Sequence, residues 1–211
     1  MRLAWLAAPI VAASLQPPSL DATARQVAQE PPAAVSHVLT EFRVFNGAED
    51  VTPASRLRVL PAGNRSAPAI DVERRTVPLA PAVYDVQAIR TSANGVRSIK
   101  WAEGLAILHY PDEGGRHLEV INFQSGYGAL QLRATRGGLA AADVALFPTG
   151  DHTELAARAL FSNDYVLFVA RAGRYDVRVQ HADHGGAADT HWLLAVDVPA
   201  GRTRLKLIET R

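Results

Sequence analysis

The sequence contains no cysteine. This absence excludes disulfides, thiolate metal ligands, a cysteine nucleophile and a lipid anchor on an N-terminal cysteine. The sequence also has no excess of charge of one sign, because it contains 22 basic and 21 acidic residues and its net charge is +1. The charges are interspersed, so there is neither a basic patch for nucleic acid nor an acidic tail. We therefore expect an apolar core to stabilise the chain unaided and no nucleic-acid partner.

Long apolar runs are missing after the N-terminus, so we expect no stable membrane span in the mature chain. Residues 1–15 have an Arg at position 2, then an apolar run that ends in small residues. This pattern is typical of a secretory signal, cleaved after Ala13 or Ser14, or after Ala24; an uncleaved anchor is the alternative. Lysine occurs only at positions 100 and 206, and this arginine bias favours a bacterial source. The sequence thus predicts a periplasmic or secreted bacterial protein with a signal region at 1–24.

The remaining chain predicts β-structure. Residues 25–35 are rich in Pro, Ala and Gln and are typical of a flexible leader. After them, short apolar runs alternate with turn residues, as in a sandwich or barrel. The expected strands cover residues 37–45, 56–60, 70–79, 84–90, 97–108, 116–123, 129–134, 144–147, 155–161, 165–170, 175–181, 191–198 and 203–208. Asn94-Gly95 is a hairpin signal between two of them, and 155–160 could instead form a helical turn.

A repeated pattern divides this region in two. Tyr84-Asp85-Val86 and Tyr175-Asp176-Val177 each follow a turn, and in both cases a Trp comes 17 residues after the Tyr. Two further pairs of turns, 61–64 with 148–151 and 111–116 with 199–202, occur in the same order. Such self-similarity indicates a duplicated unit. We predict an all-β fold of two tandem antiparallel β-sandwich domains, prealbumin-like or immunoglobulin-like, at 36–123 and 129–211, joined by a hinge at 124–128.

Strand parity assigns the repeated residues to faces. Alternation with a period of two directs the Tyr and Val of each motif into the core and the Asp toward solvent. By the same count Trp101 and Trp192 share a face with buried aliphatic residues. We therefore expect both Trp side chains in the core, and both Tyr hydroxyls bonded to backbone at a strand corner.

The turn followed by Tyr-x-Val resembles the prealbumin-like sandwiches of carboxypeptidase regulatory-like domains and of PEGA-type envelope modules. The residues that carry the resemblance are 173–177 and 82–86, although the earlier copy has Pro81-Ala82 in place of a Gly turn. Such domains are generally non-catalytic. The resemblance therefore implies a scaffold or interaction role and supplies no catalytic residues.

Two polar clusters are candidates for chemistry. His181, Asp183, His184, Asp189 and His191 could ligate a divalent metal; the alternative is a His-rich hairpin loop without metal, since the earlier copy lacks these residues.

The second cluster consists of His109, Asp112, Glu113, His117 and Glu119, which could serve acid–base catalysis. Its alternative is an exposed turn at 111–115. In neither cluster do the residues match a known catalytic or ligand spacing, and no nucleophile motif is present.

The remaining aromatic residues that could contact a partner are Tyr110, Tyr127 and Tyr165, near turns or strand starts. The sequence therefore predicts no catalytic residue, no cofactor and no metal ligand. The expected function is an exported, non-enzymatic binding or scaffold module for protein or envelope partners. The alternatives are a carbohydrate-binding module, which would need Trp101 and Trp192 exposed on a flat face, and a metal-dependent hydrolase using the 181–191 loop.

Overall fold

The computed structural model describes residues 37–108, 116–135, 139, 142–162, 165–181 and 189–209. The predicted signal and leader lie outside these residues. Residues 35–211 group together as one unit. Within the described residues, no helix is long and apolar enough to cross a membrane.

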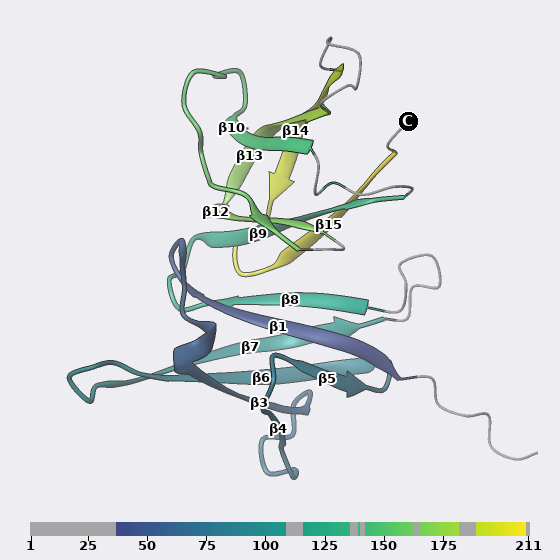
Figure 1. The fold of residues 1–211 in the computed structure, drawn as a ribbon. Coiled ribbons are helices and arrows are strands. Elements are labelled where there is room, and N and C mark those ends of the chain that lie inside the picture. The colour runs from purple at the N-terminus through teal and green to yellow at the C-terminus, as the bar shows by residue number, and fades with distance from the viewer. Residues whose placement is uncertain are drawn as a thin grey trace, which may run out of the picture. The chain divides into compact units, whose positions relative to one another are not determined.

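The first half, from Val38 to Asn122, has two facing sheets (Figure 1). Its strands are β1 (Val38–Asn46), β2 (Glu49–Asp50), β3 (Ser55–Pro61), β4 (Ile70–Val72), β5 (Thr76–Leu79), β6 (Ala82–Thr91), β7 (Arg97–Ile107) and β8 (Arg116–Asn122), with a short 3-10 helix η1 (Thr52–Ala54) after β2. One sheet has the order β4-β3-β6-β7, and the other joins β2, β1 and β5, with β8 pairing β1 in parallel.

The second half, from Tyr127 to Ile208, repeats this plan. Its strands are β9 (Tyr127–Ala134), β10 (Ala142–Pro148), β11 (Leu160–Phe161), β12 (Val166–Arg171), β13 (Gly173–His181), β14 (Asp189–Val198) and β15 (Thr203–Ile208). One sheet has the order β10-β13-β14 and the other β11-β12-β9-β15, in which β15 pairs β9 in parallel.

The pairing of the long strands is the same in the two halves. In both halves the opening strand pairs antiparallel with a strand of its own sheet (β5 or β12) and in parallel with the closing strand, whereas the three remaining long strands form the second sheet. In addition, β1 pairs antiparallel with the two-residue β2. Segment 155–160 forms no helix, and Ala157 makes an antiparallel bridge to Leu146, much as β4 pairs β3. The predicted all-β class with two sandwich halves is confirmed, with one parallel pair in each.

Three apolar clusters hold the described strands together. The first lies between the two sheets of the first half and includes Phe42 and Ile107, and the second fills the other half around Phe168. A third cluster joins the β1–β8 pair to β9 and β12, with Phe45 and Leu167 both 0% exposed. The halves therefore share buried apolar surface as well as the short connection between β8 and β9.

Candidate functional site

The predicted metal cluster lies partly within the described residues. Residues 182–188, which include Asp183 and His184, lie outside the described residues. His181 and Asp189 pair on β13 and β14, and His191 lies exposed on β14 opposite Val179. Among the side chains that the structure describes, no group of three His, Cys, Asp or Glu could hold a metal ion.

The predicted acid–base cluster is reduced to one pair. Residues 109–115 lie outside the described part of the chain, whereas His117 Nε2 lies 2.8 Å from Glu119 Oε1 on β8. This pair lines a cleft of about 520 Å³ between β8 and β15, together with Arg116, Arg202 and Arg204. The hydroxyl of Thr203, at the same cleft, already accepts a hydrogen bond of 2.8 Å from the Val120 N–H. His117 and Glu119 are therefore hydrogen-bonded to each other, and neither is bonded to a hydroxyl nucleophile among the described lining residues.

The repeated aspartate is a structural anchor. Asp85 faces away from the sandwich core as predicted, but it is only 5% exposed rather than solvated. Its carboxylate accepts two backbone hydrogen bonds of 2.9 Å, from the N–H of Gly63 and from the N–H of Gly104. These bonds lower the pKa of Asp85, because they favour the charged form. One side chain therefore ties the turn after β3 to β7.

Asp176 holds the equivalent position with one more partner. It is 3% exposed and accepts hydrogen bonds from Ala195 N at 2.8 Å and Gly150 N at 3.1 Å. His152 Nε2 lies 2.8 Å from the same carboxylate. The bonds from Ala195, His152 and Gly150 together lower the pKa of Asp176 to about 2. The prediction of two solvent-facing aspartates was therefore wrong, because the turn folds over each carboxylate.

The predicted core positions of the two tryptophans were also wrong. In β7, the two residues Glu103 and Gly104 oppose the single Asp85, because the register shifts between the Tyr84 and Val86 pairs. β14 has the same shift opposite Asp176. Each β-bulge inserts one residue and reverses the parity of the strand before it. Trp101 and Trp192 consequently lie half-buried on the outer faces of their sheets.

Each outer-face tryptophan is covered by a side chain that follows the Pro-x-Gly turn of its half. This side chain is Arg65 in the first half and His152 in the second, each two residues after the glycine of the turn. The Arg65 guanidinium lies 4.4 Å above the Trp101 ring and pairs with Glu103. In the second half His152 stacks on Trp192 with 4.2 Å between ring centroids and an interplanar angle of 16°. The rings thus present no uncovered flat platform, which is the feature that the carbohydrate-binding alternative requires.

The two motif tyrosines close strand corners as predicted. Tyr84 donates its hydroxyl hydrogen bond to Ala80 O at 2.9 Å, and Tyr175 donates to Arg171 O at 2.7 Å. Tyr84 is buried, but Tyr175 is only half-buried, and its ring reaches the surface. Burial raises the pKa of Tyr175 above its usual value.

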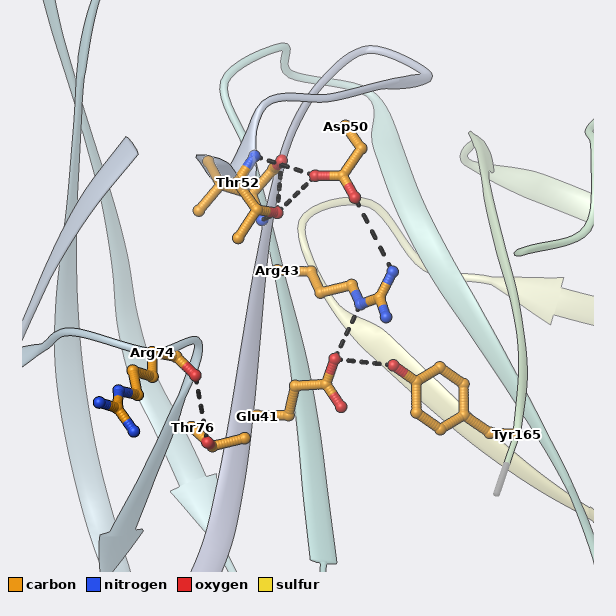
Figure 2. Close-up of polar contacts among 8 residues, drawn as sticks. Glu41, Arg43, Asp50, Thr52, Arg74, Thr76 and Tyr165 are labelled. Carbon is orange, nitrogen blue, oxygen red and sulfur yellow. Dashed lines mark hydrogen bonds and ion pairs between the residues drawn. The ribbon is translucent and has the colours of Figure 1, made fainter. Parts of the chain in front are cut away.

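A chain of polar contacts, drawn in Figure 2, connects Tyr165 of the second half to β1 of the first half. Tyr165 donates a 2.9 Å hydrogen bond to Glu41 Oε1, which also accepts a 2.8 Å bond from Arg43 Nε. The Arg43 guanidinium continues to Asp50 at 3.8 Å. Burial, followed by the Glu41 charge, raises the pKa of Tyr165 to about 12. Tyr165 is only 4% exposed, so its expected role as a surface contact was wrong.

A groove beside Tyr127 and Tyr175 is the clearest candidate for ligand binding. It has a volume of about 700 Å³ and is called the tyrosine groove below. Its walls consist of Phe45, Ala48, Tyr127, Leu155, Ala156, Ala157, Arg158, Leu160, Val169, Ala170, Arg171 and Tyr175. Such concave, mainly apolar surfaces with a few polar groups are typical of binding sites.

Arginine supplies all the charge in the lining of the tyrosine groove. Arg158 and Arg171 are exposed, and neither forms an ion pair with a described carboxylate. The Arg171 guanidinium lies 5.7 Å from the Tyr127 ring centroid. Sequence reasoning identified Tyr127 but missed Leu155, Arg158 and Arg171. The available signal was the apolar stretch at 155–160, which has an arginine in its middle and is compatible with either a strand or a helical turn.

Comparison with known proteins identifies no family. No protein-family model matches the chain, and no curated protein matches it. Among solved structures, a candidate adhesin from Bacteroides ovatus aligns over 85% of this chain and 90% of its own, with 10% identity and a TM-score of 0.28.

Two further structures align at a similar level. The C-terminal fragment of the pilus adhesin SpaC from Lactobacillus rhamnosus GG shares 10% identity over 83% of this chain and 98% of its own, with a TM-score of 0.24. The Bacillus anthracis TIE protein shares 14% identity over 82% of this chain and 34% of its own, with a TM-score of 0.30. These likenesses are too distant to assign a family, ligand or partner to the chain.

Proposed function

We propose that the chain is a non-enzymatic binding module that contacts a protein partner through the tyrosine groove. The observation that carries the proposal is the groove itself, a concave surface of about 700 Å³ lined by two tyrosines and by aliphatic side chains. Aromatic and arginine side chains are enriched at the energetic centres of protein interfaces. Leu155 is 61% exposed and lines the groove, so a partner in the groove would remove apolar surface from water there.

We place this binding function in the cell envelope. The N-terminal sequence favours export to the periplasm or the exterior, so the partner would be a protein or another envelope component. The prealbumin-like resemblance of the 173–177 segment agrees with an interaction role. The groove is lined by strand residues and by segment 155–158, which is bridged to β10 through Ala157.

We further propose that the domains extend over 36–123 and 129–211, with 124–128 as their connection. Each range contains its own apolar cluster. A flexible insertion after Ser125 tests this division. Two folded halves would leave two separable unfolding transitions in calorimetry, whereas a single fused domain would lose both halves together.

The binding role is tested by site-specific photocrosslinking in cells of the native organism. A benzophenone amino acid replaces Leu155 in the groove, and in a matched control it replaces Leu194, which is 68% exposed on β14. The expected result is one discrete protein adduct at position 155 that is absent at position 194. Identical patterns at both positions, or none at position 155, would contradict the proposal.

A further inference from the structure

We infer that the ligand of the tyrosine groove is an acidic peptide segment, in which apolar side chains are flanked by carboxylates. This inference rests on the proposed protein-binding function and adds the chemistry of the partner. Two observations carry it: the aliphatic composition of the walls and the sign of the charge in the lining.

The walls of the groove match apolar side chains. Leu155, Leu160 and Val169 lie in the lining, with alanines between the larger side chains. Ala48 contributes exposed apolar surface from the first half, whereas Phe45 is fully buried. Burial of apolar surface would supply about 25 cal/mol per Å² of area removed from water. The groove therefore favours a peptide segment with leucine-like or aromatic side chains.

The charge of the lining selects carboxylates. Arg158 and Arg171 are the charged residues of the groove lining, and among the described residues neither is neutralised by an acidic neighbour. Guanidinium groups bind carboxylates through paired, charge-assisted hydrogen bonds. A peptide with Asp or Glu beside its apolar residues would neutralise both arginines, whereas a basic peptide would be repelled.

The polar groups of the groove match a glycan less well. Sugar hydroxyls require several hydrogen-bonding side chains, but no Asp, Asn, Glu or Gln belongs to the groove lining. The hydroxyl of Tyr175 already donates to Arg171 O at 2.7 Å. A glycan would leave most of its hydroxyls facing aliphatic walls, which is unfavourable.

Selection from a random peptide display library on the full chain tests the inference. We expect the enriched peptides to combine Asp or Glu with Leu or Phe. The affinity of one selected peptide, synthesised with a fluorophore, is then measured by anisotropy. The double variant Arg158→Glu/Arg171→Glu should weaken its binding by at least about tenfold, and higher salt should weaken wild-type binding. In a second selection the same variant should enrich Lys and Arg instead.

The matched control is Arg56→Glu/Arg97→Glu, which changes the net charge equally at two exposed arginines of the first half. It should leave the peptide affinity within about twofold of wild type. The inference is overturned if the selected peptides lack acidic residues or if both double variants behave alike. A glycan panel bound in an Arg158-dependent manner would overturn it in favour of a carbohydrate ligand. A position-155 crosslink without acidic selection would refute the peptide chemistry while retaining the binding function.

Discussion

The two halves of the molecule use the same anchor but cover it differently. In each, a buried aspartate connects a Pro-x-Gly turn to a β-bulge, and a tryptophan lies on the outer face. The first half covers its tryptophan with Arg65, which pairs with Glu103, whereas the second uses His152, which contacts Asp176. The aspartate, turn and bulge that both halves share therefore stabilise the fold. Arg65 and His152, which differ between the halves, should give the two anchors different stabilities.

The largest expected loss of stability follows from replacement of the two buried aspartates. Asp176→Asn should destabilise the protein by about 3 kcal/mol and Asp85→Asn by about 2, because hydrogen bonds to charged groups contribute about 1.5–3 kcal/mol each and Asp176 has the additional His152 contact. Urea denaturation of both variants measures the free energies of unfolding. Equal losses, or a greater loss at Asp85, would show that His152 adds nothing to the anchor.

Acid should remove the Asp176 contribution, which we expect to be about 2.5 kcal/mol. The carboxyl has a pKa of about 2 in the folded protein, against about 3.9 when unfolded. Because the folded pKa is the lower one, the stabilisation is complete well above pH 4 and is lost as the pH falls from about 4 to 2. The melting-temperature difference between wild type and Asp176→Asn should thus be constant at neutral pH and shrink below pH 4. A difference unchanged at pH 2.5 would argue against the depressed pKa.

Truncation of the tryptophans should have a smaller effect than loss of a core residue. Trp192→Ala should cost about 2 kcal/mol and Trp101→Ala about 1, compared with about 3–5 for a fully buried tryptophan. The larger value is expected at Trp192 because Phe147 lies 5.7 Å from its ring centroid, in addition to His152. Thermal unfolding of both variants provides the ranking. A loss of about 4 kcal/mol in the free energy of unfolding at either site would contradict the half-buried, outer-face position of that tryptophan.

The smallest expected changes in stability follow from substitutions at the two β-bulges. Gly104 has φ of 64°, and Ala195 adopts φ of 52° at the equivalent position. Ala195→Gly should therefore stabilise by about 0.5–1 kcal/mol, and Gly104→Ala should destabilise by about 1. A Cβ at Gly104 would meet no atom within 4 Å, so the cost is conformational rather than steric. Changes of the same sign at both sites would contradict this explanation.

Much of the fold follows from local sequence patterns. The strand predicted at 203–208 has the observed bounds, and the Asn94-Gly95 turn joins β6 to β7 with Gly95 at φ of 81°. The tyrosine corners were also predictable, because the hydroxyl bonds to backbone four residues earlier. These features depend on short-range alternation and turn chemistry, which a single sequence records.

The errors arose where distant segments meet. Parity placed Trp101 in the core because the count could not include the extra residue opposite Asp85, and Ala195 gave no glycine signal for the second bulge. The tyrosine groove combines Ala48 of the first half with Tyr127 and with residues more than 100 positions later in the sequence. Such a surface depends on tertiary packing, which no local pattern describes.

The parallel pairing of first and last strands has a mechanical consequence. β1 and β8 are in register over seven residue pairs, and β9 and β15 over six. Tension applied at the start of β1 and the end of β8 acts along a parallel ladder in shear. The hydrogen bonds then share the force, whereas the bonds of a hairpin pulled apart at one end break in succession. Each half should resist stretching more strongly than its thermodynamic stability alone implies, because forced rupture depends on the barrier to unfolding.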